Sequence, residues 1–161
     1  MKINVALFGL GRIGIMHAED INSHPKFNLK YVFDIDQEIS FKASRKFKCK
    51  SLTNPSKAFA DRNIDLIFIA SSTPTHIPLI MKAAKSKKII FCEKPIDLNI
   101  KKVIQCRRKI KKYKPRILIG FNRRYDPGHY SLKESLLKGK IGRLEKIIIT
   151  SRDPAPPSLK Y

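Results

Sequence analysis

Phe8-Gly9-Leu10-Gly11-Arg12-Ile13-Gly14 is the stretch that decides the fold, because it joins a short apolar run, residues 4–8, to a segment with helical spacing. The pattern G-x-G-x-x-G is weak by itself, but between a strand and a helix it is typical of dinucleotide-binding sites. There the first glycine permits a tight turn, the second lets the backbone approach a diphosphate, and the third lets the helix pack closely on the sheet. Backbone N–H groups at the helix N-terminus then bind the anion. We therefore predict a cofactor site that includes Phe8, Gly9, Gly11, Arg12, Ile13 and Gly14.

Asp34 lies 20 residues beyond Gly14, at the end of a second predicted strand. Its carboxylate can accept hydrogen bonds from ribose hydroxyls and would repel a 2′-phosphate, since juxtaposed like charges cost several kcal/mol. The sequence therefore favours NAD over NADP as the cofactor. Three alternatives stay open: Arg12 could soften the repulsion, Asp36 could take the same role, and Asp34 could simply cap the strand.

Apolar runs and helical segments alternate through residue 121, with short connections between them. This alternation predicts an α/β fold, a Rossmann doubly wound parallel sheet over residues 1–121. Right-handed crossovers would place the loops that follow the strands along one edge, where ligands bind. Strands are predicted at residues 4–8, 30–33, 66–70, 88–92 and 116–120, and the main helices up to residue 23, over 37–48, over 75–85, and after a cap at Asp97 or Asn99.

The pattern changes after Phe121. Residues 122–161 contain a predicted helix over 127–138, a β-prone run over 144–150 and a proline-rich end. One helix and one strand cannot bury a core of their own. We therefore expect the first helix and strand of an incomplete α+β C-terminal domain, the start of a truncated substrate and oligomerisation domain.

The formal net charge of +21, from 34 Lys and Arg against 13 Asp and Glu, raises the question of nucleic-acid binding. The basic residues are mostly lysines spread along the chain, with few aromatic residues between them. The densest run, residues 107–114, falls on a helix whose apolar positions Ile100, Val103, Ile104 and Ile110 are predicted to face inward, which leaves the charges in water. We predict solvated faces and no nucleic-acid partner.

No apolar run approaches the ~20 residues that a membrane span needs, and the N-terminus is too short and too rich in glycine for a signal peptide. Cys49, Cys92 and Cys106 have neither metal-site nor redox spacing. An odd, scattered set predicts reduced thiols in the cytoplasm. We expect no membrane contact and no metal site.

With these motifs in place, the whole chain resembles the glucose–fructose oxidoreductase and inositol 2-dehydrogenase family, Gfo/Idh/MocA. Glu93-Lys94-Pro95, directly after the strand predicted at residues 88–92, is the most specific motif, and the closing residues 151–157 look like inositol 2-dehydrogenases, which oxidise myo-inositol to the 2-ketone with NAD. The other matching motifs are Gly9-Leu10-Gly11-Arg12-Ile13-Gly14, Ser71-Ser72-Thr73-Pro74-Thr75-His76 and Gly120-Phe121-Asn122-Arg123-Arg124-Tyr125-Asp126.

The resemblance implies cofactor contacts for Ser72, Thr73, His76, Glu93 and Lys94. For His76, a packing or capping role is the alternative. Lys94 would be the catalytic lysine, and its bond to proline is commonly cis in the family. A lysine at this edge also suits the chemistry, because oxidising an alcohol requires that the developing alkoxide be stabilised and the proton guided away.

The resemblance further implies substrate contacts for Asn122 and Arg123, a small polyol substrate, and a homo-oligomer for the complete protein. The sequence departs from the family in one respect: it ends before the Asp-x-x-x-His motif whose histidine is the general base. His17, His24 and His129 are each predicted to be structural or on the surface. We therefore expect a chain that is inactive alone, with a different sugar or polyol substrate, or a non-catalytic dinucleotide-binding remnant, as alternatives.

Overall fold

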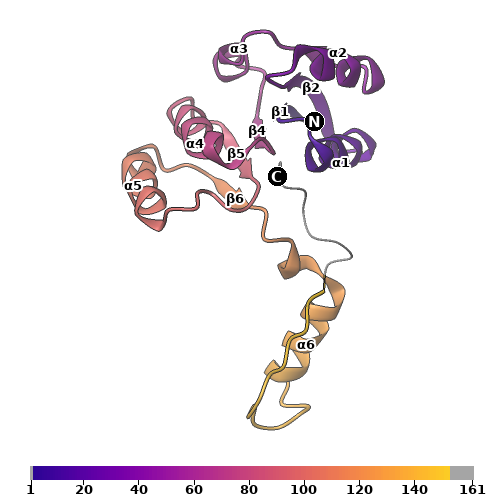
Figure 1. Cartoon of the computed structure of the whole chain (residues 1–161), viewed down its shortest axis with the longest axis vertical. Coiled ribbons are helices and arrows are strands. Elements are labelled where there is room, and N and C mark those ends of the chain that lie inside the picture. Colours follow the sequence, from indigo (N-terminus) through magenta and orange to yellow (C-terminus); the bar gives the residue numbers. More distant parts are fainter. Residues whose placement is uncertain (1, 153–161) are drawn as a thin grey trace. The chain divides into compact units, whose positions relative to one another are not determined.

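The computed structural model describes residues 2–152, and Figure 1 shows it as a ribbon. The chain divides after Phe121 into two units, which are described separately below. The first unit contains a six-stranded, all-parallel sheet with the strand order β3-β2-β1-β4-β5-β6. This order is that of the doubly wound dinucleotide-binding fold, so the predicted fold class is confirmed.

The strands and helices alternate as predicted, with differences of a few residues at their ends. The second strand is longer than predicted, because it begins at Phe27 and not at residue 30. In chain order the elements of the first unit are β1 (Ile3–Phe8), α1 (Arg12–Ser23), β2 (Phe27–Phe33), α2 (Gln37–Lys46), β3 (Lys50–Ser51), α3 (Ser56–Ala60), β4 (Leu66–Ile69), η1 (Thr73–Thr75), α4 (His76–Lys85), β5 (Ile89–Cys92), α5 (Ile100–Ile110), η2 (Lys111–Tyr113) and β6 (Ile117–Ile119).

The central strands are buried on both faces, which is why they read as continuous apolar runs. In β1, Val5 and Leu7 join the cluster that includes Ala18 and Ile21 of α1, whereas Phe8 joins the opposite cluster. Helices α1 and α2 therefore cover one face of the sheet, and α3, α4 and α5 cover the other. With both faces covered, ligands can reach the sheet at the loops that follow its strands.

The chain crosses from one side of β1 to the other at β4, which pairs directly with β1. Such a topological switch point opens a crevice beyond the carboxyl ends of the two strands. The glycine-rich loop follows β1 there, and the loop that begins at Ser71 follows β4. The fold thus brings two of the predicted motifs to one place.

Helix α5 differs from the prediction, because Ile100 and Ile104 are 67% and 43% exposed. The inward stripe runs instead through Val103, Cys106 and Ile110, spaced three and four residues apart. Both stripes have helical periodicity, and the packing of α5 against α4 selects the second.

The second unit contains η3 (Asn122–Tyr125) and α6 (Pro127–Leu137), so the predicted helix is present. The predicted strand over residues 144–150 is wrong, because these residues have no regular secondary structure. A strand needs a hydrogen-bonded neighbour, and within the described residues nothing pairs with this run. The prediction for residues 153–161, including part of the closing motif, lies outside the described residues.

Across residues 2–152, no helix is both long enough and apolar enough to cross a bilayer.

Candidate functional site

The glycine-rich loop is held tightly against the sheet by Gly9 and Gly14. Gly9 has φ +91°, a conformation that favours glycine, and a Cβ there would overlap the backbone of Ser71. A Cβ on Gly14 would overlap the carbonyl oxygen of Gly9. These two positions therefore need glycine for close packing of α1 and β4 against the loop.

Gly11 differs, because a Cβ there would meet nothing within 4 Å. It stands immediately before Arg12, the first residue of α1, and its side of the loop is open. The first N–H groups of a helix have no partner within the helix, and no side chain caps α1. The N–H groups of Arg12, Ile13 and Gly14 are thus available to an anion, and the space that a side chain at Gly11 would fill lies beside them.

Asp34 follows β2 and joins it to the glycine-rich loop. Its Oδ2 accepts a hydrogen bond from the backbone N–H of Leu10 at 2.7 Å, and its Oδ1 accepts one from Asp36 N–H at 3.0 Å. Asp36 has a different task, since its Oδ1 caps α2 by accepting from Glu38 and Ile39 N–H. The geometry therefore favours Asp34 over Asp36 as the carboxylate beside the loop.

The loop after β4 is stabilised by its own hydroxyl groups. The hydroxyls of Ser71 and Thr75 are 2.6 Å apart, and the Thr75 hydroxyl donates to the carbonyl of Ser72 at 2.7 Å. Ser72 is exposed and Thr73 is half-buried. Both residues therefore remain accessible on the switch-point side of the loop.

His76 begins α4 and is 2% exposed, so it lies behind this loop. Its Nδ1 lies 2.8 Å from the carbonyl oxygen of Pro95, and its Nε2 lies 2.8 Å from that of Ser71. Carbonyl oxygens only accept hydrogen bonds, so a ring nitrogen that carries a proton is the donor in these contacts. His76 thus ties the loop after β4 to the segment after β5.

Glu93, Lys94 and Pro95 follow β5, and the Lys94–Pro95 peptide is cis, as the family resemblance implies. The Glu93 backbone N–H donates to the Ile69 carbonyl at 2.8 Å, which continues the pairing of β5 with β4. Lys94 is exposed, whereas Glu93 is partly buried. The backbone therefore presents the lysine at the carboxyl edge of the sheet.

The prediction that His17 is merely structural or on the surface missed a contact within the site. His17 comes from α1, and its Nε2 lies 2.8 Å from Glu93 Oε1. Its place in the sequence carried a signal, because it lies three residues after Gly14 and four before Ile21, both of which are buried in the face of α1 that packs on the sheet.

Asn122 and Arg123 belong to η3 in the second unit, and both are exposed. His129 Nδ1 lies 2.9 Å from Asp126 Oδ1, and Arg123 Nη1 lies 3.5 Å from His129 Nε2. The hydrogen bond from the His129 side chain lowers the pKa of Asp126. These contacts organise the start of α6 within that unit.

The thiols do not form a reactive or metal-binding site. Burial raises the pKa of Cys49 to about 11 and that of Cys92 to about 12, and it also raises the pKa of Cys106. Such thiols stay protonated and inert at neutral pH. Over residues 2–152, no three metal-ligating side chains come together.

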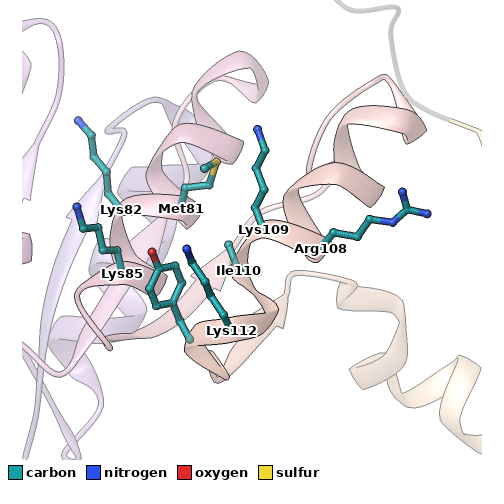
Figure 2. A pocket seen from close by; sticks show the side chains of 8 residues that line it. Met81, Lys82, Lys85, Arg108, Lys109, Ile110 and Lys112 are labelled. Carbon is teal, nitrogen blue, oxygen red and sulfur yellow. The ribbon is translucent and has the colours of Figure 1, made fainter.

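A cavity of about 500 Å³ lies away from the predicted site, between α4 and the end of α5 (Figure 2). Its cationic side chains lie near the C-terminal ends of α4 and α5, where the helix dipole favours positive charge. None of the predicted site residues lines it. The lining residues are Met81, Lys82, Lys85, Arg108, Lys109, Ile110, Lys112 and Tyr113.

Three features define a Rossmann-type dinucleotide-binding protein: the strand order of the sheet, the glycine cradle formed by Gly9, Gly11 and Gly14, and the open N-terminus of α1. The chain belongs to the Gfo/Idh/MocA oxidoreductases, since residues 3–121 match that family, described as an oxidoreductase family with an NAD-binding Rossmann fold. The resemblance stated from the sequence is therefore confirmed.

Several relatives carry names that specify an activity, and two of them illustrate the match. A myo-inositol 2-dehydrogenase of Thermotoga maritima is 38% identical over 99% of this chain and 48% of its own length. An inositol 2-dehydrogenase of Rhizobium meliloti is 36% identical over 100% of this chain and 48% of its own length. The chain thus spans about half the length of the curated relatives that it matches.

Solved structures agree with this assignment. A myo-inositol dehydrogenase from Corynebacterium glutamicum superimposes with a TM-score of 0.91 at 37% identity, over 98% of this chain and 47% of that one. A scyllo-inositol dehydrogenase from Lactobacillus casei with bound NAD(H) and scyllo-inositol has a TM-score of 0.82 at 26% identity, over 88% and 43%.

Proposed function

We propose that this chain is the dinucleotide-binding part of an NAD-dependent dehydrogenase that oxidises myo-inositol to its 2-ketone. The observation that carries the proposal is the glycine cradle, in which Gly9 and Gly14 pack against backbone while Gly11 leaves open space beside the uncapped N-terminus of α1. The relatives named inositol 2-dehydrogenases support the choice of substrate.

Each part of the cofactor has a proposed contact in this chain. The N–H groups of Arg12, Ile13 and Gly14 bind the diphosphate, with Phe8, Gly9 and Gly11 shaping the loop around it. Asp34 accepts hydrogen bonds from the adenosine ribose. Ser72, Thr73, Glu93 and Lys94 lie toward the nicotinamide, and His76 supports them from behind.

Bound NAD supplies the hydride acceptor for the reaction. Lys94 donates a hydrogen bond from its ammonium group to the substrate oxygen and would stabilise the negative charge that develops there as a general base of the complete protein takes the hydroxyl proton. Asn122 and Arg123 contact the polyol. We further propose that residues 122–161 begin a substrate and oligomerisation domain, and that the complete protein is a cytoplasmic homo-oligomer without a nucleic-acid partner.

A matched pair of variants tests the cofactor assignment. In Asp34→Asn the side chain keeps its shape and an oxygen for Leu10 N–H but loses the charge that repels a 2′-phosphate. We expect the ratio of NADP to NAD affinity to rise about tenfold, which corresponds to roughly 1.4 kcal/mol. Calorimetric titration of the purified chain with each dinucleotide measures the ratio.

Asp36→Asn is the control, because asparagine also caps a helix and Asp36 already serves α2. Its ratio should match that of the unsubstituted chain. Absence of any heat of binding with either dinucleotide, for a folded sample, would overturn the proposed function.

A non-catalytic dinucleotide-binding protein is the second candidate. It is favoured by the contacts of the histidines within residues 2–152. His76 and His129 have contacts at both ring nitrogens, while His17 binds Glu93 and His24 accepts from Lys26 N–H at the end of α1. Turnover assays with inositols and other polyols separate the two candidates.

A further inference from the structure

The carboxylate of Glu93 connects two parts of the molecule that are far apart in the sequence. Its Oε1 accepts a hydrogen bond from His17 Nε2 at 2.8 Å, across 76 residues, and its Oε2 accepts one from the backbone N–H of Lys94 at 3.2 Å. The two oxygens therefore join α1 to the backbone of the lysine that follows β5.

The ring of His17 is held in place by aromatic packing on the sheet. It contacts Phe68 of β4 and Phe91 of β5, with centroid distances of 4.7 Å and 5.6 Å. The side chains of His17 and Glu93 are 17% and 18% exposed. Partial shielding from water strengthens the hydrogen bond and raises the cost of removing one partner.

The backbone that follows β6 also lies close to this carboxylate. A Cβ on Gly120, which follows β6, would lie 2.9 Å from Glu93 Oε1 and 3.1 Å from its carboxyl carbon. Glycine at that position leaves the room that the Glu93 side chain occupies. Residues of three elements, α1, β5 and the end of β6, thus lie around the Glu93 side chain.

We propose that His17 is a positioning residue for Lys94, acting through Glu93, and this rests on the proposed function. The N-terminus of α1 holds the diphosphate, and His17 lies little more than one turn further along the same helix. The hydrogen bond to Glu93 keeps the diphosphate-binding end and the lysine at the spacing that one NAD molecule spans.

Comparison of two ligands tests the proposal. ADP occupies the diphosphate and adenosine sites, whereas NAD also reaches Lys94. In His17→Phe the ring still packs on Phe68 and Phe91 but donates no hydrogen bond. We expect NAD affinity to fall about fivefold, as for loss of one hydrogen bond, while ADP affinity stays unchanged in calorimetric titrations.

His17→Gln is the matched variant, because glutamine keeps an N–H donor with similar reach but has no ring. It should restore the ratio of NAD to ADP affinity. If His17→Phe does not fold with its unpaired carboxylate, His17→Phe combined with Glu93→Gln removes that charge and should show the same selective loss.

Amide hydrogen exchange provides a readout that needs no ligand. In His17→Phe the Lys94 amide should exchange about fivefold faster, while amides within α1 keep their rates. Equal losses of NAD and ADP affinity, an unchanged ratio in His17→Phe, or a ratio in His17→Gln as low as in His17→Phe would each overturn the positioning role. A folded chain that binds neither ligand would overturn the proposed function. The exchange rate of the Lys94 amide would then still show whether His17 holds the backbone of Lys94 in place.

Discussion

At the scale of single residues, the three glycines of the motif serve two different purposes. Gly9 and Gly14 allow backbone to approach backbone, and any side chain would collide within the protein. Gly11 keeps space open outside the protein, where the diphosphate is proposed to bind. Stability and cofactor affinity should therefore respond to different substitutions within the same six-residue pattern.

Gly11→Val should leave the free energy of unfolding nearly unchanged, because its side chain enters open space. It should weaken NAD binding at least tenfold, since the branched side chain would occupy the proposed diphosphate position. Gly14→Ala should instead destabilise the chain by roughly 1–3 kcal/mol through overpacking. Urea denaturation and calorimetric titration separate the two effects, and loss of stability in Gly11→Val would contradict this division.

Asp61 contributes to the stability of the first unit through hydrogen bonds that its carboxylate accepts. Its Oδ2 accepts from Lys30 Nζ at 2.9 Å and from the Tyr31 hydroxyl at 2.8 Å, and its Oδ1 accepts from Asn63 N–H. The hydrogen bond from Lys30 is the main reason that the pKa of Asp61 falls from 3.8 to about 2. The hydrogen bond to Asp61 also raises the pKa of Tyr31.

A carboxyl group whose pKa is lowered by folding stabilises the folded state above its unfolded pKa, and this contribution disappears as the pH falls toward 2. Asp61→Asn should therefore lose about 1 kcal/mol at pH 7, after allowance for solvent screening. The difference from the unsubstituted chain should shrink between pH 4 and pH 2. Urea denaturation at several pH values measures it, and a difference independent of pH would contradict the assignment.

At the scale of elements, the helices differ in how their N-termini are satisfied. Asp36, Asn99 and Asp126 each accept backbone hydrogen bonds at the start of α2, α5 and α6. Helices α1, α3 and α4 have no side-chain cap, and of these α1 is the longest and the one that begins beside the open space at Gly11. The missing cap is consistent with an N-terminus that is reserved for an anion.

Removing an ordinary cap should consequently affect stability alone. Asn99→Ala should cost about 1 kcal/mol of unfolding free energy, because Lys101 N–H loses its acceptor. NAD affinity should not change, since α5 does not take part in the proposed site. Thermal denaturation with and without NAD tests both statements, and a selective loss of NAD affinity would place α5 in the site.

At the scale of the whole molecule, the described residues provide the contacts proposed for the cofactor and the lysine proposed for catalysis. The family resemblance assigns the general base to a histidine of an Asp-x-x-x-His motif in the second domain, and residues 122–152 contain no such motif. General acid–base catalysis contributes roughly 10²–10⁴-fold to a rate. The 161-residue chain by itself should therefore bind NAD and yet oxidise myo-inositol at least ~10²-fold more slowly than a complete dehydrogenase of the family. Absorbance of NADH measures this, and comparable turnover would show that the base lies within this chain.

Local patterns determined a large part of this description. The alternation of apolar runs with helical segments predicted the parallel sheet. The spacing from Gly9 to Asp34 predicted that the glycine-rich loop and this carboxylate share one edge of the sheet. A cap at Asp97 or Asn99 could be predicted, and Asn99 is the one observed, because a cap acts on N–H groups two or three residues away. Such interactions join residues that are close together in the sequence, and a sequence pattern therefore predicts them.

The tertiary structure alone decided which groups meet across the chain. It brought His17 to Glu93, set Asp34 against Leu10 N–H, turned Ile100 and Ile104 outward, and left residues 144–150 without a partner strand. Each of these depends on how a helix rotates on the sheet or on whether another strand lies alongside. Periodicity restricts such arrangements to a few, and packing between distant segments selects one of them.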